Sequence, residues 1–234
     1  MITITPEKLL RTVAQLAPEV EQQLQHGPKS QPDERALWIE LSCCVLSSQV
    51  PYEMAVAVAR RVDLATMLDH SNRACRKHLE AMLTDILIQP IEVNGRLRRY
   101  RFPRLRASQL AGAVEAVSKR FGGLSVLVQQ GENPISVREW LVEDVPGFGP
   151  KQASMFIRNV GLSCDLAVLD RHTIEFMVLT SLCDRTPAGL SRLRHYEEQE
   201  RILLDYASAL GYSAGVVDWA IWIVMRAAKS LDRQ

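Results

Sequence analysis

The chain has 234 residues, of which 47% are hydrophobic and 24% are charged, and its formal net charge is +1. This composition is ordinary for a soluble globular protein, and the length allows one large domain or two small ones that share a core. No apolar run is long enough for a membrane-spanning helix, and the N-terminal MITITPEKLLRTV lacks the apolar stretch of a signal peptide. We therefore expect a cytoplasmic protein with no membrane partner.

The five cysteines include no CxxC pair, and two of them are adjacent in the apolar stretch LSCCVL. An odd count in this pattern indicates reduced, mostly buried thiols. The five histidines are scattered and include no HxxxH pair. The sequence therefore predicts no zinc site and no iron–sulfur cluster, and we expect no metal ligand among the side chains of the site.

Helical periodicity dominates the chain and predicts an all-α protein. In chain order, we expect helices over residues 36–47, 52–62, 108–121, 125–130, 151–160, 171–182, 196–210 and 216–228. A capping box, Ser136-x-x-Glu139, marks the start of a further helix that includes Trp140. The dipeptide Asn94-Gly95 indicates a short hairpin near residues 91–99, and no other segment alternates like a strand.

One segment, GRLRRYRFPRLR over residues 95–106, concentrates positive charge. Its arginines are interleaved with Tyr100 and Phe102. Guanidinium groups pair with phosphate in a bidentate fork, so the segment is a candidate contact to the DNA backbone, represented by Arg99 and Arg101. A solvated basic connector that folds against acidic side chains explains the segment equally well.

The stretch VPGFGPKQAS, over residues 145–154, has the glycines and the lysine of a phosphate-binding turn. Its spacing excludes a P-loop, because one residue separates Gly147 from Gly149, and a glutamine stands where a dinucleotide fingerprint needs its third glycine. Pro146 should end one helix, the glycines should permit a tight turn with positive φ, and Pro150 should begin the next helix. The stretch therefore predicts a helix-hairpin-helix whose exposed amides bind a DNA phosphate.

Lys151 and Asp170 are the two candidate catalytic residues. A cation at the start of a helix opposes the helix dipole, which favours the neutral amine, and a neutral lysine is a nucleophile of the Schiff-base type. A solvent-exposed lysine that only touches phosphate accounts for the spacing at least as well. Asp170 directly precedes a helix, where it is a good N-cap, but an ionised carboxylate there also suits stabilisation of a developing sugar cation. The two residues lie nineteen positions apart, and their combination with the glycine hairpin is a far more specific sign of a catalytic site than either residue alone.

These segments resemble the helix-hairpin-helix DNA glycosylases. VPGFGPKQASMFIRNVG followed by LAVLDRH is similar to their hairpin, lysine and aspartate, and ELSCCVLSSQ and YRFPRLRASQL are similar in style to the compact 8-oxoguanine DNA glycosylase/lyases of archaea and some bacteria. The resemblance covers residues 36–177. It implies two helical subdomains with the active-site cleft between them: residues 31–162, with the helix-hairpin-helix at 136–160, and residues 1–30 with 163–234.

The resemblance also implies roles for single residues. Lys151 would attack C1′ of the damaged nucleoside, expel the base and permit β-elimination through the imine, while Asp170 would activate the lysine or stabilise the sugar cation. Gly147, Phe148 and Gly149 would bind the DNA backbone. The damaged base must be flipped out, because C1′ is unreachable inside the stack.

Five further residues are candidates for base flipping and the base pocket: Gln49, Met155, Asp218, Trp219 and Trp222. The resemblance places Gln49 where relatives fill the gap left by a flipped base, although a polar helix end explains it equally well. Met155, one helical turn after the lysine, could pack on the base, the tryptophans could wall the pocket, and Asp218 could read the base. Core packing accounts for the methionine and the tryptophans as well.

The resemblance implies a monomeric repair enzyme that acts on double-stranded DNA in the prokaryotic cytoplasm, associated with the nucleoid. It implies no cofactor, since no cysteine follows Cys183 to complete an iron–sulfur cluster, and it leaves room for a monovalent cation at the hairpin backbone. The C-terminal AAKSLDRQ lacks the aromatic or lysine ending of part of the compact branch, which leaves the excised base open. Two alternatives stand: the same chemistry on another modified base, for example in hypermodified viral DNA, and a non-catalytic DNA-binding module, which would need neither Lys151 nor Asp170.

Overall fold

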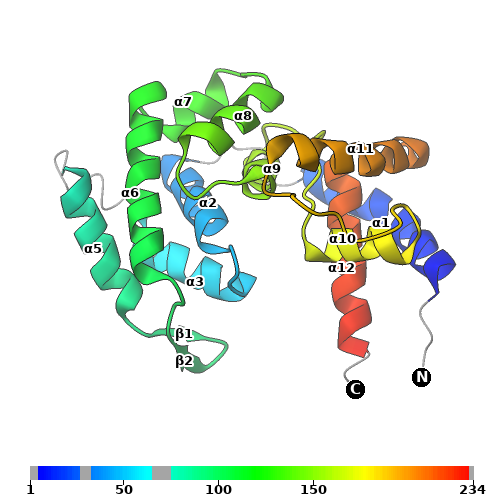
Figure 1. Ribbon diagram of the computed structural model, residues 1–234, viewed down its shortest axis with the longest axis horizontal. Coiled ribbons are helices and arrows are strands. Elements are labelled where there is room, and N and C mark those ends of the chain that lie inside the picture. Colours follow the sequence, from blue (N-terminus) through cyan, green and yellow to red (C-terminus); the bar gives the residue numbers. More distant parts are fainter. Residues whose placement is uncertain (1–4, 27–32, 65–74, 232–234) are drawn as a thin grey trace. The chain divides into compact units, whose positions relative to one another are not determined.

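The computed structural model describes residues 5–26, 33–64 and 75–231, and these form helices and one two-stranded sheet (Figure 1). The all-α prediction is confirmed. Contacts divide the chain into two compact units. We call the described part of residues 31–162 the hairpin unit, and the described parts of residues 1–30 and 163–234 the terminal unit.

The hairpin unit is built around one mostly buried helix. This helix, α2, buries eight residues and contacts α3, α6, α7 and α9. α5 packs along α6, and the two run side by side in Figure 1. The helices of this unit are α2 (Glu34–Leu46), α3 (Tyr52–Val62), α5 (Arg76–Ile88), α6 (Pro103–Arg120), α7 (Leu124–Gln129), α8 (Pro134–Asp144) and α9 (Pro150–Asn159).

The sheet is the short hairpin that Asn94-Gly95 predicts. Strands β1 (Ile91–Val93) and β2 (Arg96–Arg98) pair antiparallel, and the two turn residues have φ of 53° and 73°. Two residues with positive φ match the right-handed twist of paired strands. β1 packs against α3, and Arg61 at the end of α3 donates hydrogen bonds to the carbonyls of Gln89 and Pro90 at 3.3 and 2.8 Å. The hairpin is therefore fixed at its base.

The terminal unit combines the first described helix with the last three. It contains α1 (Pro6–His26), α10 (Arg171–Leu179), α11 (Leu193–Leu210) and α12 (Ala214–Leu231), and α12 contacts the other three helices. Their shared core includes Val13, Phe176, Leu203 and Ile221. In the described part of the chain, no single helix is long and apolar enough to cross a membrane. Only α11 and α12 taken together have the necessary length and composition, and they are bent by 95° at their junction.

Some helix boundaries differ from the prediction. The capping box at Ser136 is wrong, because α8 begins at Pro134 and the side chain of Asn133 accepts hydrogen bonds from the amides of Ile135 and Ser136. α6 begins five residues before the expected start, since Pro103 fits the first helical turn and the basic residues after it mask the apolar periodicity. α10 ends at Leu179, three residues early, where the backbone turns left-handed at Ser181.

Candidate active site

The glycine turn between α8 and α9 forms the predicted hairpin. Gly147 has φ of 93°, in the left-handed region that favours glycine, and a Cβ there would lie 3.0 Å from Val45 and 3.2 Å from Gln109. The expected positive φ is wrong for Gly149, whose φ of −119° and ψ of 177° make it the extended N-cap of α9. The turn therefore packs closely against α2 and α6, and a side chain on its first glycine would push it away.

The start of α9 has no side-chain cap. Gly149 offers no side chain, Pro150 has no N–H, and the amides of Lys151 and Gln152 donate to no residue that the structure describes. Unpaired amides at the positive end of a helix dipole form an anion site. This geometry suits a phosphate held without a side-chain charge.

Phe148 supports the hairpin from inside. Its ring is 8% exposed and lies edge-on to Phe156 of α9, with the ring centroids 6.0 Å apart. Its amide donates to the carbonyl of Val145 at 3.2 Å, which closes the turn. Of the three hairpin residues expected to bind the DNA backbone, Phe148 thus has its side chain in the core and its amide in use.

Lys151 lies in the first turn of α9 and is half-buried. Among the described residues, its amine has no hydrogen bond and no ion pair. Burial raises the pKa of the Cys44 thiol on α2 well above its usual value, Glu40 raises it further, and the charge of Lys151 acts in the opposite direction. The Glu40 carboxylate accepts hydrogen bonds from Asn159 at 2.7 Å and from Cys44 at 3.4 Å. The lysine therefore keeps a free amine beside a thiol that stays protonated.

Asp170 is the N-cap of α10, as its position predicts. Its Oδ1 accepts hydrogen bonds from the amides of His172 and Thr173 at 2.7 and 2.9 Å and from the Thr173 hydroxyl at 3.3 Å. Its Oδ2 accepts none from the part of the chain that the structure describes, and the side chain is half-buried. One oxygen holds the helix, and the other remains available to a substrate.

Buried polar side chains hold the backbone that leads to Asp170. Three successive amides of this extended segment each donate to a side chain of α11 or α12. The bonds run from Ala167 to Glu200 (2.8 Å), from Val168 to Asp218 (2.5 Å) and from Leu169 to the Tyr196 hydroxyl (2.9 Å). The position of the aspartate is therefore set by two helices that are distant in sequence.

Asp218 thus contacts the segment before the aspartate. It is 2% exposed, and one carboxylate oxygen is engaged by the amide of Val168. Tyr196 and Glu200, which share this task, are 0% and 3% exposed and were missed by sequence analysis. Polar residues on the apolar face of a helical pattern are the signal that could have identified them.

His172 lies beside the aspartate on α10. Burial lowers its pKa, the charge of Asp170 opposes the shift, and Lys229 acts in the same direction as burial. Its buried Nδ1 has no hydrogen-bond partner among the described residues. A neutral imidazole therefore adjoins the carboxylate.

Gln49 lies in the turn between α2 and α3 and is exposed. Its φ of 61° is in the left-handed region, which is uncommon for a residue other than glycine. Two buried side chains hold this turn: the Tyr100 hydroxyl donates to the carbonyl of Leu46 at 2.8 Å, and Arg106 donates to the carbonyl of Ser48 at 3.2 Å. The turn is thus fixed by two residues of the basic segment 95–106.

The outer part of that segment presents arginines to solvent. All three residues of β2 are exposed, as are Arg99 and Arg101. We call these five residues the basic arm. Among the described residues, none of its arginines forms an ion pair, and the Arg101 guanidinium lies 4.8 Å from the ring of Phe102. The acidic partners that a simple connector requires are absent from the described part of the chain, which favours an external anion.

Of the remaining pocket candidates, Met155 is buried and the two tryptophans are partly buried. Met155 is 8% exposed and belongs to the core of the hairpin unit. Trp219 packs against the core of the terminal unit, and the Arg226 guanidinium lies 4.5 Å from the ring centroid of Trp222. Each unit thus brings some of the candidates together: the hairpin, Lys151, Met155 and the Gln49 turn in one, and Asp170, Asp218 and the two tryptophans in the other.

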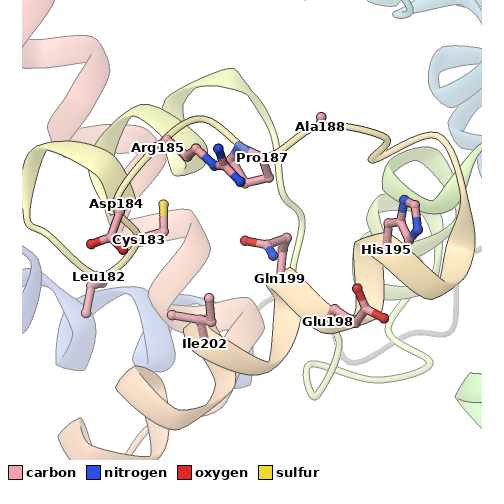
Figure 2. Close-up of a pocket in the computed structure, with 10 residues that line it drawn as sticks. All are labelled: Leu182, Cys183, Asp184, Arg185, Pro187, Ala188, His195, Glu198, Gln199 and Ile202. Atoms are coloured by element: carbon pink, nitrogen blue, oxygen red, sulfur yellow. The ribbon is translucent and has the colours of Figure 1, made fainter.

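A cavity of about 540 Å³ in the terminal unit contains none of these residues (Figure 2). It lies between the chain after α10 and the start of α11, and Figure 2 shows Cys183 and Arg185 on one side with His195 and Gln199 on the other. Within the described residues, no group of three or more histidine, cysteine, aspartate or glutamate side chains is arranged to hold a metal ion.

The chain matches the family model described as 8-oxoguanine DNA glycosylase over residues 20–212. An 8-oxoguanine DNA glycosylase/AP lyase of Thermotoga sp. strain RQ2 is 31% identical over 222 residues, which are 94% of this chain and 95% of the relative. The crystal structure of the 8-oxoguanine DNA glycosylase of Thermotoga maritima superposes with a TM-score of 0.68 at 28% identity, over 93% of this chain and 95% of that one. The 8-oxoguanine glycosylase/lyase of Methanocaldococcus jannaschii, in complex with a 15mer DNA that contains 8-oxoguanine, gives 0.64 at 26% identity, over 92% and 95%. The chain therefore belongs to the 8-oxoguanine DNA glycosylase family of helix-hairpin-helix proteins.

Proposed function

We propose that this protein is a DNA glycosylase and AP lyase that excises 8-oxoguanine from double-stranded DNA. The observation that carries the proposal is the start of α9, where a lysine follows a glycine hairpin and neither its amine nor the first free amides have a partner among the described residues. Relatives over almost the whole chain are named 8-oxoguanine DNA glycosylase/AP lyase, which supports the same substrate and both activities.

In the proposed reaction, the amine of Lys151 attacks after it has lost its proton: it forms a bond to C1′ while the bond from C1′ to the base breaks. The base leaves with the bonding electrons and takes up a proton, and the lysine loses one. The free oxygen of Asp170 stabilises the positive charge that develops on the sugar. Opening of the sugar gives an imine, and loss of a proton from C2′ then breaks the C3′–O bond and nicks the strand. Side chains supply every group, so this chemistry needs no metal or redox cofactor.

The DNA contacts follow from the same geometry. The backbone of Gly147 and Gly149 and the open start of α9 hold a phosphate next to the lysine. The basic arm, with Arg99 and Arg101, binds phosphates farther along the duplex. Gln49 fills the gap in the stack once the damaged nucleotide has been flipped out.

Borohydride trapping tests this proposal. The wild-type protein with a duplex that contains 8-oxoguanine should give a covalent protein–DNA adduct, because borohydride reduces the imine to a stable amine. Lys151→Gln should give none, while Lys119→Gln, at an exposed lysine of the same unit, should trap like the wild type. An unchanged adduct from Lys151→Gln would reject the lysine as the nucleophile.

The same assay addresses the two alternatives. A panel of duplexes with other modified bases shows whether another lesion is trapped faster than 8-oxoguanine. A wild-type protein that binds these duplexes but traps none of them, and also fails with an abasic site, would be a DNA-binding module without lyase activity.

A further inference from the structure

One buried arginine joins two loops of the hairpin unit. Arg106 donates to the carbonyl of Ser48 in the Gln49 turn at 3.2 Å, and through its other terminal nitrogen to Oε1 of Gln109 at 2.5 Å. Gln109 lies against the glycine hairpin, since a Cβ on Gly147 would be 3.2 Å from both its Cβ and its Cδ. The side chains of Arg106 and Gln109 together thus link the turn that carries Gln49 to the hairpin.

Fold stability alone does not account for this arginine. It is 6% exposed, its Nε has no hydrogen-bond partner, and it forms no ion pair among the described residues. Its hydrogen-bond partners, which are the carbonyl of Ser48, the amide of Gln109 and the hydroxyl of Tyr100, are all neutral groups. Because a buried charge without an opposite charge is costly, an apolar side chain would fill this space more favourably. The guanidinium is more consistent with a role in orienting the loops that it contacts.

The turn that Arg106 holds is itself in an unfavourable backbone conformation. Gln49 has φ of 61°, and such a residue keeps its conformation only where its surroundings impose it. Here they include Arg106 and Tyr100, and Tyr100 is 5% exposed and donates to the carbonyl of Leu46 at 2.8 Å. The backbone that carries the exposed side chain of Gln49 is therefore held from beneath by two buried side chains.

The geometry points to Arg106 as a positioning residue for base flipping. It fixes the Gln49 turn at a set spacing from the glycine hairpin, so that Gln49 enters the duplex at the nucleotide whose strand the hairpin holds. The inference rests on the proposed function. Arg106 acts through Gln49, and it does not itself touch DNA.

The test separates flipping from chemistry by changing the substrate. Single-turnover excision is measured for the wild type, Arg106→Lys and Arg106→Met on 8-oxoguanine opposite cytosine and opposite an abasic-site analogue, where flipping costs little. Lysine keeps the charge but lacks the fork that reaches both acceptors. Opposite cytosine, both variants should excise about 10- to 100-fold more slowly than the wild type. Opposite the analogue, they should approach the wild-type rate.

Two controls belong to this design. Arg76→Lys alters an exposed arginine of the same unit, paired with Glu115 at 3.1 Å, and should match the wild type on both duplexes. Gln49→Ala should itself be slow opposite cytosine. Adding Arg106→Lys to Gln49→Ala should slow excision no further, because the arginine acts through the glutamine.

Equal slowing on both duplexes would overturn the inference and would make Arg106 a general support of the fold. Additive losses in the double variant would overturn it as well. If Arg106→Met does not fold, Arg106→Lys and the double variant decide the question alone. A wild-type protein that excises 8-oxoguanine from neither duplex would reject the proposed function itself, which is a different result from a defect confined to the variants.

Discussion

The helices α9 and α10 begin in opposite ways. At the start of α9 the cap is a glycine, a proline follows, and the next two amides have no acceptor among the described residues. At the start of α10 the cap is Asp170, whose Oδ1 accepts two amides and a hydroxyl. One helix start is left for a ligand to complete, and the other is completed by the protein.

This difference shows how one local feature serves two purposes. An open start suits a phosphate, because no group in the described part of the chain competes for its amides, and Lys151 lies in the same turn. A capped start fixes the direction of its carboxylate, because three bonds hold one oxygen while the other stays available. The proposed nucleophile and the proposed charge stabiliser thus both depend on how a helix begins.

The largest effect in this comparison should come from variants of Asp170 that separate its role as a helix cap from the role of its charge. Asp170→Asn keeps a good N-cap but removes the charge, so excision should fall about 100- to 1000-fold while the free energy of unfolding changes by only a few tenths of a kcal/mol. Asp170→Ala should show a similar loss of activity and in addition lose about 1 kcal/mol of stability. Single-turnover excision and urea denaturation measure the two quantities.

Retained activity in Asp170→Asn would mean that the charge is dispensable and that the residue is a cap alone. Glu34 offers a matched control, since it also accepts amides at a helix start, from Leu124 and Ser125 of α7 at 2.8 and 2.6 Å. Glu34→Gln should lower stability without changing the rate of excision.

Local sequence was sufficient for the parts of the site that depend on neighbouring residues. The glycine hairpin, the start of α9 at Pro150 and the cap of α10 at Asp170 follow from residues within a few positions of each feature. The β-hairpin at Asn94-Gly95 was predictable for the same reason, because turn chemistry is local.

Contacts between distant segments were not predictable in this way. In the sequence, Arg106 is one of six arginines in a charged run. In the structure it is buried, and its hydrogen bond to Ser48 spans 58 residues. Asp218 read as a residue that could contact the base, whereas its bond to Val168 spans 50 residues. A single sequence gives the type of a buried polar residue, but its partner depends on tertiary packing.

A smaller effect should come from removing charge outside the hairpin. Because the hairpin amides are neutral, most of the salt dependence of DNA binding should arise from arginines. Replacing Arg99 and Arg101 by alanine should weaken binding to any duplex and reduce the slope of log affinity against log salt by about 2. Titrations of an undamaged duplex at several salt concentrations measure this slope. A slope equal to that of the wild type would show that the basic arm does not contact DNA phosphates and is a solvated connector.

The smallest effect concerns His172, next to the cap of α10. Burial, opposed by Asp170, leaves its folded-state pKa below the usual 6.5. Between the two values the unfolded chain binds more protons, so the stability from the neutral imidazole is present above pH 6.5 and is lost as the pH falls toward the folded-state pKa. The melting temperature should therefore fall less steeply between pH 7.5 and pH 5 for His172→Gln than for the wild type. His78→Gln, at an exposed histidine, should follow the wild type. Parallel declines for His172→Gln and the wild type would show that the imidazole is as well solvated in the folded chain as in the unfolded one, and that burial at the start of α10 leaves its pKa unchanged.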